Sequence, residues 1–176
     1  PGSDWRYGPS VNIQGDVVEK LSGPDLDAFF RSRIFDPLKM DDTGFHVEAD
    51  KLSRVSAVHT YDASGKIVAA GEVRPAPTAP PEFLSGSGGL FSTAEDYWRF
   101  AQMLLNGGEL DGVRLLKPET VELMRTNVLA DGVTVDLYGP SQTGVGFGMD
   151  FAIIMDPKAA GTPQGLNSFY WGGAFG

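Results

Sequence analysis

The stretch Ser168–Gly176, SFYWGGAFG, decides how the rest of the chain is interpreted. Aromatic residues followed by two glycines predict a strand whose backbone is open to a ligand, because glycine places no side chain in the way. The chain stops inside this pattern, and it begins as abruptly, with Pro1–Tyr7 leading straight into a helical pattern. We therefore expect the middle of a longer protein, with missing N- and C-terminal segments that complete its fold.

The composition is that of an ordinary globular chain with an acidic balance. Of 176 residues, 41% are hydrophobic and 21% are charged, which argues against disorder. The net charge of −9 argues against nucleic acid and anionic membrane surfaces as partners. Cysteine is absent, so disulfides and thiol catalysis are excluded. No apolar run approaches the ~20 residues of a membrane helix. The compartment stays open between the cytoplasm and a periplasmic or secreted location.

Apolar residues at helical spacing predict two helices before residue 40. The first covers Val11–Leu21 and stops at Gly23-Pro24. The second follows at once, and Pro37 should end it because proline cannot continue a helix. The apolar residues of this second helix are Leu26, Phe29, Phe30 and Ile34.

Two more helices are predicted in the second half of the chain. One begins at a capping box, Ser92–Glu95, and ends at Asn106–Gly108. A tight hairpin turn is expected at Asp111-Gly112. The other helix has Pro118 in its first position and runs to about Arg125. The apolar stripe of the capped helix consists of Tyr97, Phe100, Ala101, Leu104 and Leu105.

Strand patterns occur in two places. Ala57–Tyr61 and Lys66–Ala69 flank a turn sequence and predict a hairpin. The proline-rich segment 73–82 then predicts an extended loop. Near the end, Gly146–Phe151 and Asn167–Phe175 predict two strands, which we interpret as antiparallel neighbours.

Several kinds of catalytic site are poorly supported by the residues. The two histidines, His46 and His59, lack the spacing of metal ligands. Gly86–Gly89 is not followed by the Lys-Ser/Thr pair of a phosphate loop, and no Gly-x-Ser-x-Gly elbow occurs. Asp41-Asp42 lacks the periodic oxygen ligands of a calcium loop. No metal or other cofactor is therefore predicted.

Four motifs follow one another along the chain. They are Trp5-Arg6-Tyr7 before a helix, Arg33–Phe45 (RIFDPLKMDDTGF), Gly88–Asp96 (GGLFSTAED) and Trp171-Gly172-Gly173. In this order they resemble serine β-lactamases of the class C type and their esterase relatives, and the last is similar to family VIII carboxylesterases. The resemblance covers essentially the whole chain. It implies part of an α+β, β-lactamase/transpeptidase-like fold, with a mainly helical region at 1–142 and truncated strands of the catalytic antiparallel sheet at 143–176.

The resemblance also implies roles for individual residues. In such enzymes a serine attacks an acyl carbon and forms an acyl-enzyme. Tyr7 would relay protons between the nucleophile and the leaving group, whereas the alternative is a half-buried aromatic residue at a helix entry. Trp171, Gly172 and Gly173 would flank a small-molecule acyl substrate, and the amide of Ala174 would be an oxyanion donor. The alternative there is a glycine-bearing edge strand with a packed tryptophan.

The chain also departs from the resembled pattern. No lysine has a serine three positions before it, so the Ser-x-x-Lys nucleophile is absent from these residues. Pro9 stands where the lactamases carry asparagine, and Trp171 where a cationic residue attracts the penicillin carboxylate. Both changes favour an esterase or another acyl hydrolase, while Lys39 in place of glycine is interpreted as a surface variation. A non-catalytic binding or regulatory module and a relative of D-Ala-D-Ala peptidases remain alternatives.

Overall fold

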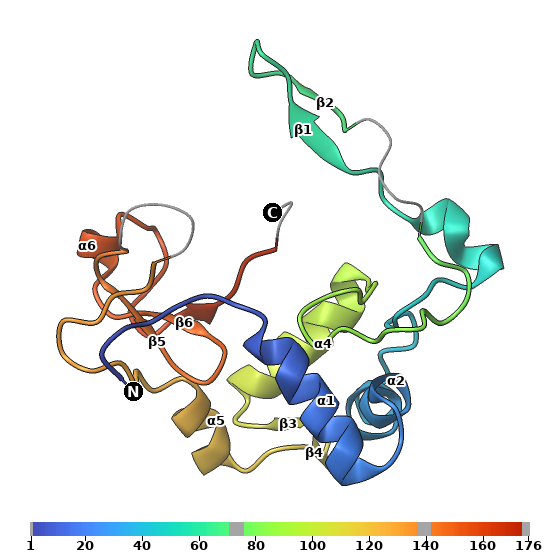
Figure 1. Ribbon diagram of the computed structural model, residues 1–176, viewed down its shortest axis with the longest axis horizontal. Coiled ribbons are helices and arrows are strands. Elements are labelled where there is room, and N and C mark those ends of the chain that lie inside the picture. Colours follow the sequence, from blue (N-terminus) through green and yellow to red (C-terminus); the bar gives the residue numbers. More distant parts are fainter. Residues whose placement is uncertain (1, 71–75, 137–141, 174–176) are drawn as a thin grey trace. The chain divides into compact units, whose positions relative to one another are not determined.

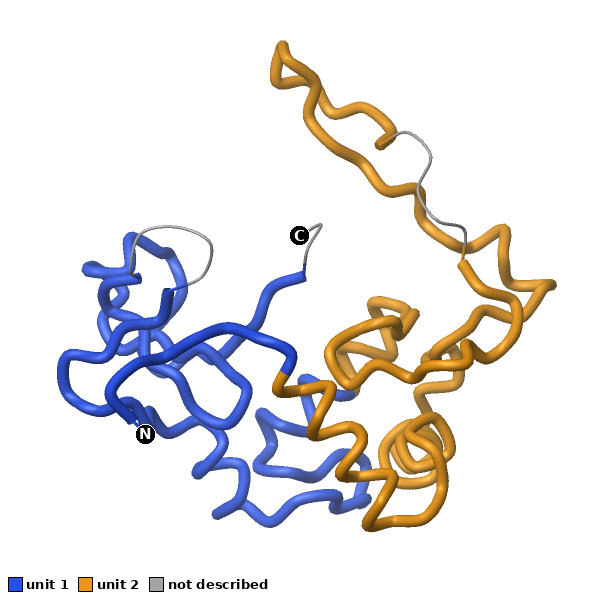
Figure 2. The backbone as a smooth tube through the Cα atoms, in the orientation of Figure 1, with its two compact units in different colours: residues 1–9, 100–174, 176 blue, residues 10–99, 175 orange. Residues whose placement is uncertain are grey.

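The computed structural model describes residues 2–70, 76–136 and 142–173. These residues divide into two compact units, which Figure 2 colours separately. Unit 1 combines residues 1–9 with 100–174, and unit 2 is formed by residues 10–99. Helices and small antiparallel sheets together confirm the α+β class (Figure 1). The division at residue 142 drawn from the sequence stays a prediction.

Unit 2 begins with α1 (Ser10–Ser22), which confirms the first helix. The second helix begins as α2 (Leu26–Phe30), and the carboxylate of Asp25 caps it by accepting a hydrogen bond from the Ala28 amide at 2.8 Å. Helical backbone continues through the π-helical turn η1 (Arg31–Phe35) into α3 (Asp36–Leu38).

The prediction that Pro37 ends this helix is therefore wrong. In η1 the backbone widens, and the Asp36 amide donates to the Arg31 carbonyl five residues earlier. A widened turn relieves the clash between a proline ring and the carbonyl four residues before it, so the helix can pass through Pro37. It ends at Lys39, whose backbone is left-handed, with a φ of 56°.

The rest of unit 2 is mostly irregular. The 3₁₀ helix η2 (Ala49–Arg54) precedes the predicted hairpin, which is confirmed as β1 (His59–Tyr61) and β2 (Ile67–Ala69). The carboxylate of Asp62 closes the hairpin turn by accepting hydrogen bonds from the Ser64 amide and hydroxyl and from the Lys66 amide. Residues 76–82 form the expected loop without helix or strand, while 73–75 lie outside the described residues.

Helix α4 (Ala94–Leu105) lies where the capping box predicted it, but its cap is one residue later. The hydroxyl of Thr93, not Ser92, accepts the hydrogen bond from an amide of the first turn, that of Asp96, at 3.1 Å. The apolar stripe also differs, since Tyr97 and Leu105 are 64% and 66% exposed while Met103 and Leu104 are buried. The prediction missed this rotation because a polar residue, Asp96, occupies the buried face.

Unit 1 contains a small hairpin, one longer helix and a sheet. The turn at Asp111-Gly112, with φ of 50° and 79°, joins β3 (Glu109–Leu110) to β4 (Val113–Arg114) as predicted. Helix α5 (Pro118–Met124) confirms the proline at its start, and the short helix α6 (Pro157–Ala160) was not predicted. The sheet consists of β5 (Val145–Phe147), β6 (Ala152–Ile154) and β7 (Phe169–Tyr170).

The interpretation of the last two predicted strands as neighbours is wrong. The strand order is β5-β6-β7, and both pairs are antiparallel, so β6 separates them. All three residues of β6 are buried, which gives a short apolar run without the alternation that marks a half-exposed strand.

Each unit has its own apolar core. In unit 2 the buried apolar residues are Leu26, Phe35, Leu38, Met40 and Phe45. In unit 1 they are Met103, Leu104, Leu110, Val121, Val135, Ala152, Ile153 and Ile154. Within the described ranges, no helix has both the length and the apolar character needed to cross a membrane.

Candidate functional site

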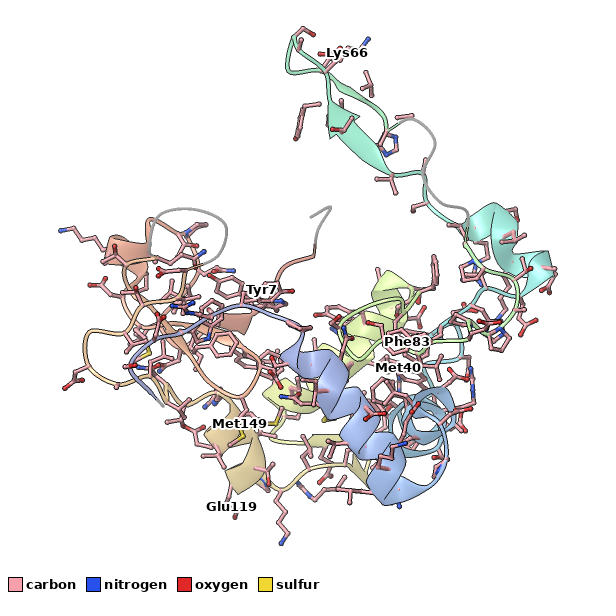
Figure 3. The ribbon with its side chains drawn as sticks, viewed as in Figure 1. Tyr7, Met40, Lys66, Phe83, Glu119 and Met149 are labelled. Atoms are coloured by element: carbon pink, nitrogen blue, oxygen red, sulfur yellow. The ribbon has the colours of Figure 1, made fainter. Side chains whose placement is uncertain are left out.

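Tyr7 belongs to a cluster of aromatic rings in unit 1, which we call the aromatic cluster: Trp5, Tyr7, Phe147 and Trp171. The Tyr7 ring lies 5.7 Å from Trp171 and 6.5 Å from Trp5, measured between ring centroids. Trp5 and Trp171 are themselves 6.4 Å apart. Figure 3 labels Tyr7 on the segment that leads into α1. The first and last of the four sequence motifs therefore meet through their aromatic side chains.

Strand β7 places Trp171 at this cluster. Tyr170 pairs with Ala152 and Phe169 with Ile153, so β7 is fixed against the buried strand β6. The Phe169 ring also packs edge-on against Phe151 at 5.3 Å. Trp171 follows immediately after this strand, and its position is set by pairing that begins one residue earlier.

The backbone beyond Trp171 is open. Gly172 and Gly173 are both exposed, and a Cβ added to Gly172 would meet no atom within 4 Å. The predicted strand Asn167–Phe175 is thus shorter in the structure, because β7 ends at Tyr170 and the exposed glycines follow it as irregular backbone. That a ligand lies along this backbone stays a prediction. The predicted oxyanion donor, Ala174, lies outside the described residues.

Strand β5 brings a ring that the sequence analysis missed. Phe147 lies 5.1 Å from Trp5 and 5.5 Å from Trp171, and it meets the latter edge-to-face at 83°. The signal was present as a single aromatic residue between Gly146 and Gly148 in a predicted strand. The ring contact between Phe147 and Trp171 shows that β5 and the residue after β7 contribute to one cluster, although β6 lies between the two strands.

One ion pair lies in the same N-terminal segment. Asp4 accepts a hydrogen bond from Arg6 Nε at 2.7 Å, and this bond holds the pKa of Arg6 above its ordinary value. Both side chains are well exposed, so the pair makes only a small contribution to stability. Arg6 lies between Trp5 and Tyr7 in sequence, and its charge is paired with Asp4, which is not part of the aromatic cluster.

The two middle motifs have a different role, because they meet in unit 2 through buried polar contacts. Asp96 Oδ2 accepts hydrogen bonds from the Thr43 hydroxyl at 2.8 Å and the Asp42 amide at 2.9 Å. The hydroxyls of Thr43 and Ser92 are 2.8 Å apart, and Gly44 pairs with Phe91 in an antiparallel bridge. These contacts join residues 42–44 to residues 91–96, which are far apart in sequence.

The Ser85–Gly89 loop likewise has a structural explanation. Asn12 Oδ1 on α1 accepts hydrogen bonds from the Ser85 hydroxyl and from the Ser87 amide and hydroxyl. A Cβ on Gly86 would lie 2.2 Å from the Val11 carbonyl oxygen, so only glycine fits there. The loop is fastened to the start of α1.

The two histidines show no metal-site geometry. His46 Nε2 lies 3.3 Å from Glu48 Oε1, and His59 lies on the exposed strand β1. In the part of the chain that the structure describes, no three His, Cys, Asp or Glu side chains are grouped to hold a metal ion.

The chain has a β-lactamase/transpeptidase-like fold, as comparison with known proteins shows. The chain belongs to the β-lactamase family, because the sequence pattern of that family matches residues 1–176. It is 36% identical to Protein Rv1367c of Mycobacterium tuberculosis and 32% identical to Esterase EstB of Burkholderia gladioli, covering all of this chain in both cases. Among solved structures it is similar to EstCE1, "a hydrolase with promiscuous acyltransferase activity", with a TM-score of 0.79, 25% identity and 100% of this chain covered.

These comparisons confirm the family and the fold class. The chain spans about half the length of these proteins: 45% of Rv1367c, 46% of EstB and 47% of EstCE1. Because relatives include esterases and acyltransferases, serine hydrolysis and acyl transfer is the chemistry of the chain's family. The roles predicted for Tyr7, Trp171, Gly172, Gly173 and Ala174 stay predictions.

Proposed function

We propose that the whole protein to which this chain belongs is a serine hydrolase that acts on ester or amide acyl substrates through an acyl-enzyme. The observation that carries the proposal is the 5.7 Å contact between the rings of Tyr7 and Trp171. It joins the motif that supplies a proton-transfer group to the strand that would flank the acyl group. The side-chain contacts made by the other two motifs account for them as structural elements.

Each residue has a defined task in this proposal. Tyr7 accepts the proton of the attacking serine and passes it to the leaving group. Gly172 and Gly173 leave the strand backbone uncovered, so that an acyl group can lie along it. The amide of Ala174 donates to the oxygen on which negative charge develops. Trp171 forms a wall of the acyl site where strand β7 ends.

Two residues favour esters over β-lactams as substrates. Trp171 offers no positive charge to the carboxylate that penicillins carry, and Pro9 has no side-chain amide to hold the substrate's own amide. A relative of peptidases acting on D-Ala-D-Ala stems would also need a cation for the terminal carboxylate. The ester hydrolase is therefore the preferred form of the proposal.

The nucleophile would come from outside these 176 residues, since none of them forms a Ser-x-x-Lys motif. We expect the chain alone neither to hydrolyse p-nitrophenyl esters nor to react with a fluorophosphonate, whereas the whole protein does both. Stoichiometric labelling of a serine in the isolated chain would contradict this part of the proposal.

Tyr7 is tested by replacement with phenylalanine in the whole protein. Tyr7→Phe keeps the ring and its packing but removes the hydroxyl, so kcat for p-nitrophenyl acetate should fall by roughly 10²–10⁴. Tyr61→Phe is the matched control, because Tyr61 is exposed on β1 of unit 2 and its variant should keep full activity. An unchanged kcat in Tyr7→Phe would remove this tyrosine from the mechanism.

The second candidate is a binding or regulatory module without catalysis, and the lack of Ser-x-x-Lys in this sequence favours it. Its aromatic cluster and open strand would then hold an acyl compound without turning it over. Saturable binding of an intact ester by the whole protein, with no product formed, would support this candidate. Turnover of the same ester excludes it.

A further inference from the structure

Phe147, on strand β5, contacts both tryptophans of the aromatic cluster, as Tyr7 also does. Its centroid lies 5.1 Å from Trp5 at an interplanar angle of 59° and 5.5 Å from Trp171 at 83°. Edge-to-face and tilted geometries are those that aromatic pairs prefer, since the positive ring edge meets the negative face. Phe147 thus lies between a residue of the N-terminal segment and one that follows β7.

The backbone of Phe147 is fixed by the segment that follows α5. Its amide donates to Asn127 Oδ1 at 3.0 Å, and its carbonyl accepts from the Val128 amide at 2.9 Å. Asn127 Oδ1 also accepts from the Leu129 amide at 3.2 Å. One side-chain oxygen therefore ties the strand that carries Phe147 to the loop beside it.

The glycines on either side of Phe147 let this loop approach. A Cβ on Gly146 would lie 2.7 Å from Asn127 Cγ, and a Cβ on Gly148 would lie 2.1 Å from the Met124 carbonyl oxygen. Atoms at such distances overlap, so neither position accepts a side chain without movement of the loop. The backbone on both sides of Phe147 is thus closely packed, against the Asn127 side chain at Gly146 and against the Met124 carbonyl at Gly148.

We propose that Phe147, fixed by Asn127, is a positioning residue that orients Trp171 and, through Trp171, the phenol of Tyr7. Phe147 supports the edge of Trp171, and Trp171 in turn packs on the Tyr7 ring at 5.7 Å. A smaller side chain at position 147 lets both tryptophans move, and the phenol moves with them. This inference rests on the proposed function for its catalytic consequence, but the arrangement of the rings is testable without any catalysis.

The first test uses the chain itself and the near-ultraviolet circular dichroism of its aromatic residues. Trp5 and Trp171, 6.4 Å apart and tilted by 60°, are close enough for their transitions to couple. Phe147→Leu should lose most of this signal while its far-ultraviolet spectrum stays that of the parent. Phe151→Leu is the matched control, because it removes the same ring from the same sheet region, where the partner is Phe169. A near-ultraviolet spectrum that is unchanged in Phe147→Leu, or reduced equally in both variants, overturns the inference.

Asn127 supplies a second variant if Phe147→Leu fails to fold. Asn127→Ala removes the acceptor for the Phe147 amide and should reduce the tryptophan signal, whereas Asn127→Asp keeps an oxygen at that place and should restore it. Restoration by aspartate supports the inference because a general loss of packing would not respond to one acceptor atom. Equal spectra for the alanine and aspartate variants contradict it.

The catalytic consequence is tested in the whole protein. A displacement of about 1 Å in a catalytic group costs up to ~100-fold, so Phe147→Leu should lower kcat for p-nitrophenyl acetate by 10- to 100-fold, with KM changed less. A merely destabilised enzyme would keep full kcat per folded molecule, so kcat is compared after correction for the folded fraction. If the parent has no esterase activity, the proposed function fails while the spectra still decide the positioning. If activity exists and Phe147→Leu leaves kcat per folded molecule unchanged, the positioning role is wrong.

Discussion

The two units carry the family's motifs in different physical forms. In unit 2 the motifs meet in the buried polar contact of Thr43 and Asp96, which are 5% and 7% exposed. In unit 1 they meet in an aromatic cluster where Tyr7 is 47% exposed and the neighbouring Gly172 faces open space. Motifs of one family therefore differ here in their surroundings, and we propose that those of unit 2 serve the fold and those of unit 1 the chemistry. The contacts of their side chains separate the two cases.

The difference follows from what burial does to a polar group. A buried carboxylate such as Asp96 is stable only when hydrogen bonds replace its lost hydration, so its surroundings are fixed. A group that transfers protons needs access to a substrate, and the exposure of Tyr7 is compatible with the role proposed for it. Substitutions made in one unit at a time therefore separate an effect on stability from an effect on the aromatic cluster.

The largest stability effect is expected for Asp96→Ala in unit 2. The change leaves the Asp42 amide and the Thr43 hydroxyl without their shared acceptor inside the protein. Because unsatisfied buried groups are costly, the free energy of unfolding should fall by about 3 kcal/mol. Urea denaturation measures this loss. Glu95→Ala, at the exposed neighbouring position of α4, should change it by less than about 1 kcal/mol.

A partner variant sharpens this result. Thr43→Val removes only the hydroxyl and should cost less than Asp96→Ala, since the Asp42 amide keeps its acceptor. In a double-mutant cycle the two changes should be non-additive by about 1 kcal/mol, because they remove the same hydrogen bond. Additive effects would show that Thr43 and Asp96 contribute independently, against the contact described for unit 2.

Alanine substitution at two glycines of unit 1 should have different effects, on stability at Gly148 and on esterase turnover at Gly172. Gly148→Ala places a Cβ 2.1 Å from the Met124 carbonyl oxygen and should lower the free energy of unfolding by about 2 kcal/mol. Gly172→Ala meets nothing within 4 Å and should change it by less than about 0.5 kcal/mol. In the whole protein, Gly172→Ala should nevertheless lower esterase turnover, because the added methyl group occupies the open strand. Equal stability losses at both positions would contradict the assignment of Gly172 to a ligand surface.

Lys39 offers a gain in stability within a motif of unit 2. Its φ of 56° is left-handed, and a side chain raises the energy of that backbone by about 1 kcal/mol relative to glycine. Lys39→Gly should therefore raise the free energy of unfolding by about 1 kcal/mol. Lys39→Ala retains the Cβ and is the control that should give no such gain. The resembled family has glycine here, and the helix end at this residue explains that preference better than surface variation does.

Much of the fold could be predicted from local sequence signals. Caps and apolar spacing located α1, α4 and α5, and turn residues located both hairpins. These signals act within a few residues of the element that they specify. Strand β6 escaped detection because its three apolar residues show no alternation, and Pro37 misled because relief by a π-helical turn depends on backbone geometry.

The candidate site divides in the same way. Tyr7 and Trp171 were found because each lies in a motif with a recognisable neighbourhood. Phe147 was not, because its importance comes from strand order and from an acceptor, Asn127, that lies 20 residues away in sequence. Residues that position others are generally of this kind, since they act through contacts between distant segments.

The smallest expected effect concerns Asp42, whose ion pairs should make the stability of unit 2 depend on pH. Hydrogen bonds from Arg54 at 2.7 Å and Lys51 at 2.6 Å lower the pKa of this carboxyl to about 2, from an ordinary value of 3.8. Because the pKa of Asp42 is lower in the folded state, its two ion pairs stabilise the protein above pH ~4. This contribution is lost as the pH falls toward 2. Because both ion pairs are partly exposed, their contribution to the free energy of unfolding should stay below about 1 kcal/mol.

Denaturation of Asp42→Asn between pH 7 and 2 measures this contribution. The variant should be slightly less stable than the parent at neutral pH and should converge with it near pH 2, where the parent carboxyl also becomes protonated. Asp41→Asn, at the exposed adjacent position, is the control and should follow the parent curve. If Asp42→Asn remains parallel to the parent down to pH 2, the ion pairs do not hold the carboxyl in its charged form. The polar contacts of unit 2 would then depend on Asp96 and Thr43 alone.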